Sequence, residues 1–241
     1  MRHGVPFLEV LRWARRWPAL SSFVGVAAFC GFSMAFLDRP LAVFWKATVS
    51  GEIEGFLKIV ARLGEGQAWY ILGGVGLVGC WIASRRASSP ERAAFFLAHG
   101  RSALFFLVSL AASGLVLRLA KFAFGRSRPQ GLFADGLYGF YPFSGQWLLN
   151  SFPSGHSQTI WAAMIALLLI YPRYDVVYLA LALLVSLSRM LTTAHYLSDV
   201  VMGSYLGIAI TLWVYGHFER KGGSVRRSST APSWTATRPG S

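Results

Sequence analysis

Long uncharged apolar stretches recur along the chain, and their lengths give the first prediction. Three of them reach about 20 residues, the length that an α-helix needs to cross a bilayer: 17–37, 66–84 and 200–218. Three others are interrupted or bounded by charged residues: 102–117 with its continuation to Lys121, 157–172 and 176–188. Each becomes long enough when its polar neighbours lie at the membrane interface. The pattern predicts an all-α, polytopic membrane bundle with six transmembrane helices.

A short amphipathic helix is expected between the first two spans. Five apolar residues fall on one helical face there, whereas the charged residues fall elsewhere, which is typical of an interfacial helix and not of a seventh span. The apolar residues are Ile53, Phe56, Leu57, Val60 and Leu63, and the charged residues are Glu52, Glu54, Lys58 and Arg62.

The two ends of the chain differ from this core. Residues 1–18 combine four arginines with tryptophans, which predicts a basic helix lying on the cytoplasmic leaflet. The next apolar run lacks a clear cleavage site, so we interpret it as a retained first span and not as a signal peptide. The tail 219–241 is basic, rich in small and polar residues and expected to be disordered, which leaves 19–218 as one six-span domain.

Composition supports the membrane class. Hydrophobic residues make up 54% of the 241 residues and charged residues only 14%, which is too apolar for a soluble domain of this length. The net charge of +13 fits arginines that set topology, and nucleic acid is not an expected partner because the basic residues lie beside apolar runs. Cys30 and Cys80 lie within apolar stretches and are interpreted as buried reduced thiols.

The arginine distribution predicts the orientation. Basic residues precede the first span, lie between spans two and three and between spans four and five, and follow span six, so both termini are expected in the cytoplasm. These residues are Arg12, Arg15, Arg16, Arg85, Arg86, Arg92, Arg173, Arg220, Lys221, Arg226 and Arg227. The loops after spans one, three and five are then extracytoplasmic, and the last two carry basic residues that oppose this trend.

Three polar clusters fall at that extracytoplasmic end. One runs from Lys121 to Arg128-Pro129, the second is Pro153-Ser154-Gly155-His156, and the third contains Ser188-Arg189, His195 and Asp199. Lys121, Arg128 and Arg189 together, with a single acid among the clusters, describe a site for an anion. For Arg118 and Arg126, snorkelling at a helix end is at least as good an explanation as a functional role.

Each cluster has its own chemical interpretation. Ser154 and Gly155 open the fourth helix, where free backbone N–H groups and the helix dipole favour a phosphate. His195 and Asp199 are four residues apart, which on a helix lets the carboxylate orient the ring for nucleophilic attack. His156 is placed to act as an acid on the leaving group. No metal or other cofactor is expected, because the surrounding cations would repel a metal ion and further acidic ligands are lacking.

The clusters resemble the signature of the membrane-bound type 2 phosphatidic acid phosphatase family, which shares its core with vanadium haloperoxidases. That signature is Lys, six residues, Arg-Pro; then Pro-Ser-Gly-His; then Ser-Arg, five residues, His, three residues, Asp. Every fixed position is present between Lys121 and Asp199, about a third of the chain.

The resemblance implies roles for the site residues. His195 would become a phosphohistidine, Asp199 would orient it, and His156 would protonate the leaving group and then activate water. The phosphate oxygens would be held by Lys121, Arg128, Ser154, Gly155 and Arg189. Bacterial relatives of this size act on undecaprenyl pyrophosphate, phosphatidylglycerophosphate or lipid A phosphates at the extracytoplasmic face of the inner membrane, so the resemblance implies a metal-independent lipid phosphatase there.

Several alternatives stay open at this point. The aromatic-rich loop 130–151 is equally compatible with a lid over the site and with a passive interfacial anchor. The same residues would serve a lipid-to-lipid phosphotransferase, a haloperoxidase or a non-catalytic protein that binds lipid phosphates. Membrane burial argues against the haloperoxidase, and the intact set of nucleophile, acid and orienting carboxylate argues against binding alone. The sequence does not give the head group or the oligomeric state.

Overall fold

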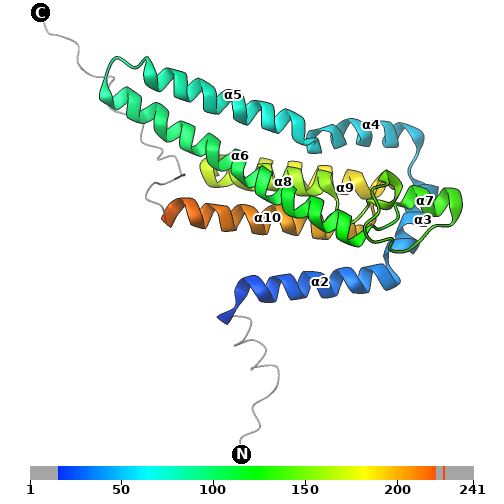
Figure 1. The fold of residues 1–241 in the computed structure, drawn as a ribbon. Helices are drawn as coiled ribbons and strands as arrows, with labels where there is room; N and C mark the ends of the chain where they lie inside the picture. Colours follow the sequence, from blue (N-terminus) through cyan, green and yellow to red (C-terminus); the bar gives the residue numbers. More distant parts are fainter. Residues whose placement is uncertain (1–15, 221–224, 226–241) are drawn as a thin grey trace, which may run out of the picture.

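The computed structural model describes residues 16–220 and residue 225, and this part of the chain is almost entirely helical. The predictions for segments 1–18 and 219–241 fall largely outside the described residues. Long helices lie side by side along one axis, with short helices at one end (Figure 1). The helices are α2 (Pro18–Phe36), α3 (Asp38–Thr48), α4 (Gly51–Ala61), α5 (Gly66–Arg85), α6 (Pro90–Phe124), α7 (Pro129–Asp135), α8 (Gly155–Ile170), α9 (Asp175–Leu191) and α10 (Leu197–Arg220), with single 3₁₀ turns η1 (Arg62–Gly64), η2 (Trp147–Leu149) and η3 (Pro172–Tyr174).

The predicted fold class is confirmed. Five helical segments are long and apolar enough to cross a membrane. The sixth predicted span, α8, has 16 residues and lies against α6, α9 and α10 in the centre of the bundle. Nine of its residues are buried, as expected for an apolar helix packed at the centre of a bundle. The five longer segments are Pro18–Phe36, Gly51–Arg85, Pro90–Phe124, Pro172–Leu191 and Leu197–Arg220.

One boundary and one additional helix differ from the sequence prediction. The third span begins at Pro90 and not near residue 102, because Ser89 caps the helix by accepting a hydrogen bond from the Arg92 N–H. A helix that the hydropathy pattern did not reveal, α3, follows the first span directly. The amphipathic helix predicted near residue 53 is present as α4, and its Leu57 and Val60 are buried where α4 packs against α9.

Close packing of α8 against α10 depends on two glycines in α10. A Cβ atom on Gly203 would lie 2.3 Å from the backbone oxygen of Ser154, and one on Gly207 would lie 2.5 Å from the backbone oxygen of Gln158. Small residues four apart let two helix backbones approach each other inside a membrane. This contact fixes the beginning of α8 against the beginning of α10.

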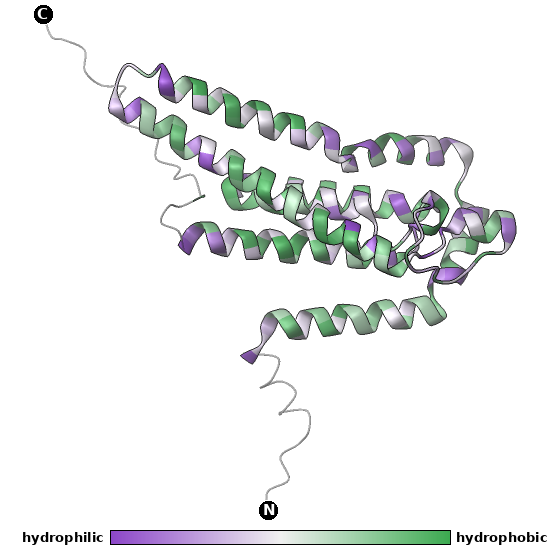
Figure 2. Ribbon diagram, in the orientation of Figure 1, coloured by the Kyte–Doolittle hydropathy of each residue, from purple (hydrophilic) through white to green (hydrophobic). Residues whose placement is uncertain are grey.

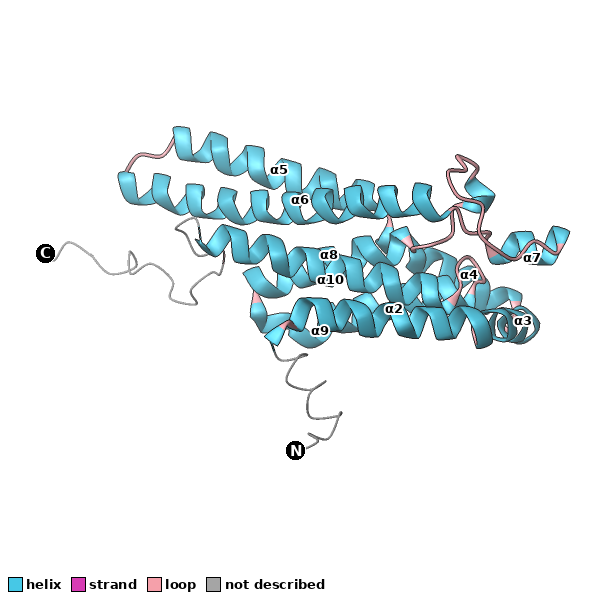
Figure 3. Ribbon diagram, turned by 60° about the horizontal axis from the view of Figure 1, so that its bottom comes forward, coloured by secondary structure: helices cyan, strands magenta, loops and turns pink. Residues whose placement is uncertain are grey.

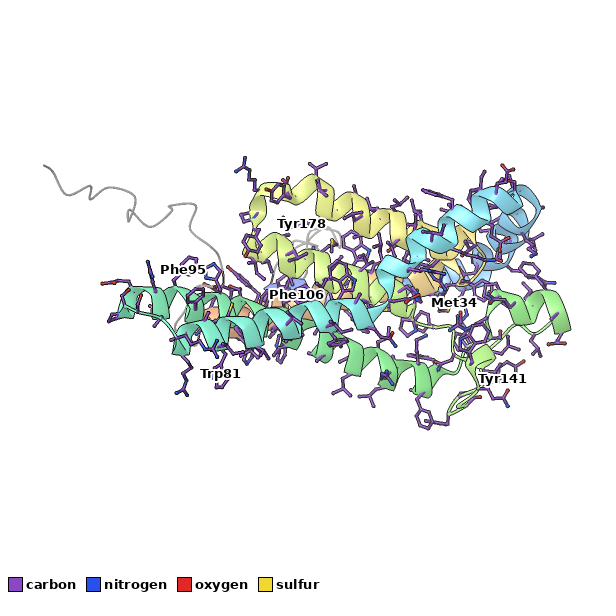
Figure 4. All side chains as sticks on the ribbon, turned by 90° about the horizontal axis from the view of Figure 1, so that it is seen from above. Met34, Trp81, Phe95, Phe106, Tyr141 and Tyr178 are labelled. Carbon is purple, nitrogen blue, oxygen red and sulfur yellow. The ribbon has the colours of Figure 1, made fainter. Side chains whose placement is uncertain are left out.

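The two ends of the bundle differ in character. The α5–α6 turn, the α8–α9 turn, the start of α2 and the last turn of α10 lie at one end, as the arginine pattern predicted, whereas α3, α7 and the longest loop lie at the other (Figures 1 and 3). Apolar residues dominate the long helices between these ends (Figure 2). Trp81 and Phe95 mark the arginine-rich end, and Met34 and Tyr141 lie toward the other, where the three polar clusters meet (Figure 4).

Candidate functional site

Arg128 and His195 meet at the centre of the candidate site. Arg128 Nη1 lies 3.4 Å from His195 Nε2, and the two residues are 8% and 3% exposed. The backbone carbonyls of Trp147 and Asn150 accept hydrogen bonds from the Arg128 Nε and Nη2 groups, at 3.0 and 3.3 Å. The Trp147 ring also lies 4.2 Å from the guanidinium carbon, a cation–π distance. The aromatic loop 130–151 therefore holds the guanidinium beside the imidazole.

Lys121 approaches the same position from the last turn of α6. Its Nζ donates to the backbone carbonyls of Asn150 and Ser151, at 2.7 and 3.3 Å. Gly155, at the start of α8, is so close that an added Cβ would lie 4.0 Å from the Lys121 Cε. The loop that positions Arg128 thus also positions Lys121. Lys121 lies next to the predicted phosphate-binding residues Ser154 and Gly155 at the start of α8, which we call the cradle.

The neighbours of His195 assign its tautomer. An arginine can only donate, so the contact with Arg128 makes Nε2 the acceptor. Nδ1 faces two oxygens, Ser151 Oγ at 3.3 Å and Asp199 Oδ2 at 3.5 Å. The ring proton therefore resides on Nδ1, and Nε2 carries a free electron pair on the side of the cations.

Asp199 orients His195 by a geometry that differs from the predicted one. His195 is not part of a helix, because α10 begins only at Leu197. Asp199, in the first turn, instead accepts a hydrogen bond from the Tyr196 N–H at 3.0 Å, as in a capping box. The Ser151 hydroxyl donates to the same carboxylate oxygen at 2.5 Å and also lies 3.3 Å from the ring nitrogen Nδ1. The His195–Asp199 pairing is present, but Ser151 shares the orienting role.

Burial and positive charge determine the protonation of these groups. Burial, followed by the charges of Arg128 and Lys121, lowers the pKa of His195 well below its usual value, although Asp199 opposes this shift. Burial and the neighbouring Arg189 lower the pKa of Arg128 to about 10. His195 is consequently neutral near pH 7, and the uncompensated cations favour a bound anion.

The cradle at the start of α8 lies next to this pair. Ser154 is fully buried, and its N–H donates to the backbone carbonyl of Asp199 at 2.8 Å, which joins the cradle to the first turn of α10. No side-chain cap is formed by Ser154, so its hydroxyl does not occupy the first N–H groups of the helix. His156 packs against Gly64 of η1, where an added Cβ would lie 2.8 Å from the His156 Cβ. The turn η1 therefore closes one side of the cradle.

Arg189 completes the set from the end of α9. Its backbone carbonyl accepts from the His195 N–H at 3.0 Å, and its side chain acts electrostatically on Arg128 and His156. The buried Arg189 Nε has no hydrogen-bond partner among the described residues. A buried donor of this kind is stabilised when an anion binds. The structure thus brings together all eight residues predicted for the site.

Comparisons with known proteins identify the family of this chain. The model of the PAP2 superfamily matches residues 102–222. A lipid A 1-phosphatase from Rhizobium johnstonii is 32% identical over 224 residues, which cover 88% of this chain and 88% of that protein. The chain belongs to the PAP2 superfamily. Its membership confirms the predicted class of membrane-bound lipid phosphatase.

Further relatives agree with this assignment. A lipid A 1-phosphatase from Rhizobium etli is 44% identical over 95 residues, covering 39% of this chain and 41% of that protein. The crystal structure of a transmembrane PAP2 type phosphatidylglycerolphosphate phosphatase from Bacillus subtilis superimposes with a TM-score of 0.62 at 18% identity, over 85% of this chain and 97% of that chain. The last comparison supports the fold.

Sequence reasoning missed three residues that support this PAP2 site. Arg126, for which snorkelling was a competing explanation, is 2% exposed and bonds two carboxylates, Asp199 at 2.6 Å and Asp38 at 2.8 Å. The expectation of a single acid is wrong, because Asp38 reaches the cluster from the start of α3. Ser151 was also missed. Asp38 gave no local signal because its charged partner, Arg126, is 88 residues away along the chain.

Proposed function

We propose that this PAP2 protein hydrolyses the phosphate at position 1 of lipid A, by a phosphohistidine mechanism at the extracytoplasmic face of the bacterial inner membrane. The observation that carries the mechanism is that Arg128 Nη1 lies 3.4 Å from Nε2 of His195, a ring on which Lys121 also acts electrostatically. The substrate is suggested by the three similar proteins that are named lipid A 1-phosphatase. Undecaprenyl pyrophosphate and phosphatidylglycerophosphate are the alternative substrates.

The proposed first step transfers the phosphoryl group to the enzyme. The Nε2 electron pair of His195 forms the N–P bond as the bond between phosphorus and the lipid oxygen breaks. His156 gives its proton to that departing oxygen, so the lipid leaves as a neutral hydroxyl. The nonbridging oxygens are stabilised by Lys121, Arg128, Arg189 and the N–H groups at the start of α8.

The second step releases phosphate. His156, now neutral, takes a proton from a water molecule whose oxygen attacks phosphorus, and the N–P bond breaks to restore His195. Net, one phosphate ester and one water give one alcohol and one phosphate. A lipid acceptor in place of water would make the protein a phosphotransferase.

The proposal is tested by assaying purified protein in detergent on a panel of lipid phosphates, in the presence of excess chelator. We expect phosphate release from lipid A, inhibition by vanadate, and mass spectra that show loss of the phosphate at position 1. His195→Ala should abolish release, because the mechanism forms the N–P bond on Nε2 of this residue. Unchanged activity in that variant would contradict the phosphohistidine mechanism.

Two further outcomes would revise the substrate or the reaction. Faster turnover of undecaprenyl pyrophosphate or phosphatidylglycerophosphate would replace lipid A as the substrate. Phosphate that appears on a second lipid instead of in solution would establish phosphotransfer.

A further inference from the structure

Three charged side chains from distant parts of the chain form a buried cluster behind the nucleophile. Asp38, Arg126 and Asp199 are 1%, 2% and 0% exposed. They come from the α2–α3 junction, the loop after α6 and the first turn of α10. Removing charges from water costs more than a buried ion pair usually returns in stability. The cluster therefore calls for an explanation other than folding energy.

Arg126 determines which way the carboxylate of Asp199 faces. Its Nη1 donates to Asp199 Oδ1 at 2.6 Å and to the Ser198 hydroxyl at 2.7 Å. The other carboxylate oxygen of Asp199, Oδ2, therefore faces His195 and Ser151. The guanidinium itself is fixed by the Tyr196 ring, which lies 4.3 Å from its central carbon. Arg126 thus acts on the nucleophile through Asp199.

Asp38 holds the far side of Arg126. Its Oδ2 accepts from Arg126 Nη2 at 2.8 Å and from the Ser198 hydroxyl, and its Oδ1 accepts from the Ser33 hydroxyl at 2.7 Å and from the Ser198 N–H at 3.1 Å. With Asp38 included, one positive and two negative charges leave the cluster at −1. Without Asp38, Arg126 and Asp199 would cancel.

We infer that Arg126 and Asp38 are positioning residues for phosphoryl transfer: Arg126 aims Asp199 at His195, and Asp38 gives the cluster its net negative charge. This inference rests on the proposed phosphohistidine mechanism. When Nε2 bonds to phosphorus, the ring keeps its Nδ1 proton and becomes cationic, while the departing oxygen takes its proton from His156. The negative cluster stabilises that cation without touching the substrate.

Two conservative variants test the inference. Asp38→Asn keeps the shape of the side chain but brings the charge of the cluster to zero, and Arg126→Lys keeps the charge but cannot span both carboxylates. We expect each to lower kcat about 10- to 100-fold, by analogy with the loss of an outer partner of a metal-bound histidine. The inhibition constant of inorganic phosphate should change by less than about twofold, because phosphate binds the cations without bonding to Nε2 and those cations are intact.

A matched control removes an ion pair elsewhere. Lys58→Met breaks the exposed Glu54–Lys58 pair, 2.8 Å long and remote in sequence from the site, and should keep the wild-type kcat. Rates are divided by the number of sites that bind vanadate, so a loss of folded protein does not register as a loss of kcat.

The outcomes separate the inference from the proposed function. A wild-type protein that releases no phosphate from any lipid would refute the proposed function. An active wild type with unchanged kcat in both variants would overturn the inference alone. So would an inhibition constant for inorganic phosphate that rises in parallel with the loss of kcat, which would place the cluster in phosphate binding. A failure of both variants to fold would also overturn it, by assigning the cluster to stability.

Discussion

At the scale of single residues, the two ring nitrogens of His195 have opposite surroundings. Nδ1 faces the oxygens of Ser151 and Asp199, whereas Nε2 faces the guanidinium of Arg128. Acceptors on one side and a donor on the other select a single tautomer. The cations that would hold phosphate also keep the ring neutral, so anion binding and nucleophile activation depend on the same charges.

The lowered pKa of His195 predicts the acid side of the pH profile. A pKa below the usual value of about 6.5 keeps the imidazole neutral, and therefore nucleophilic, as the pH falls through that value. We expect kcat/KM to hold its plateau down to about pH 6.5 and to decline only below it. The measurement is phosphate release over a pH series at low substrate concentration.

Substrate ionisation must be separated from that of the enzyme. A phosphate monoester also titrates near pH 6, so the series is repeated with a substrate whose leaving group differs. If the pH midpoint of the decline in kcat/KM changes with the substrate, the decline reports ionisation of the substrate. A decline whose midpoint stays at or above pH 6.5 for both substrates would contradict the low pKa of His195.

At the scale of elements, the loop between α6 and α8 has a structural role in the site. Backbone carbonyls of Trp147, Asn150 and Ser151 hold Arg128 and Lys121. The loop begins at Gly125, which has a φ of 57° and lies so close to Tyr141 that a Cβ would be 1.8 Å from its carbonyl oxygen. The two interpretations of this loop, lid and anchor, both missed this function.

The α8–α10 contact gives a prediction about stability. Gly203→Ala would place a methyl group 2.3 Å from the Ser154 oxygen, and backbone atoms cannot move aside as a flexible side chain can. We expect a cost of about 1–3 kcal/mol or more, as for other overpacked interiors, together with lower activity, because Ser154 opens the cradle. Thermal unfolding in detergent measures the first effect and phosphate release the second.

Gly74→Ala is the matched control. Gly74 is also in the middle of a long helix, α5, but an added Cβ would meet nothing within 4 Å. This variant should unfold at the wild-type temperature or slightly above it, since alanine favours helix. Equal unfolding temperatures for the two variants would mean that α8 and α10 are less tightly packed than the structure shows.

The sequence predicted a feature only where the residues that form it lie close together along the chain. The spans and the three clusters were accessible because hydropathy and fixed spacing are local properties of the chain. The partners of Arg126 were not, because Asp38 precedes it by 88 residues and Asp199 follows it by 73. The start of α6 was placed too late because the polar residues of its first turns hid a helix that is longer than a span.

At the scale of the whole molecule, the arrangement of the helices predicts the topology. The site clusters lie at one end and Arg85, Arg92 and Arg173 are placed at the other by the α5–α6 and α8–α9 turns (Figure 1). Because arginine-rich ends usually stay in the cytoplasm, the site end is expected to face outward. This orientation would expose the site to lipid phosphates of the outer leaflet.

Cysteine labelling checks that orientation. In a Cys30→Ala, Cys80→Ala background, Asp135→Cys at the end of α7 should react with a membrane-impermeant maleimide added to whole cells, whereas Arg173→Cys should react only after permeabilisation. The two positions serve as controls for each other. The reverse pattern would place the candidate site in the cytoplasm.

The position of Asp38 has a consequence for any attempt to shorten or recombine this protein. The family model matches only residues 102–222, yet Arg126 depends on a carboxylate from the α2–α3 junction and His156 packs against Gly64. The matched portion by itself would leave one side of a buried guanidinium without its carboxylate partner and one wall of the cradle missing. Hybrids between relatives should therefore keep their N-terminal helices together with the loop that carries this arginine, as one inherited unit.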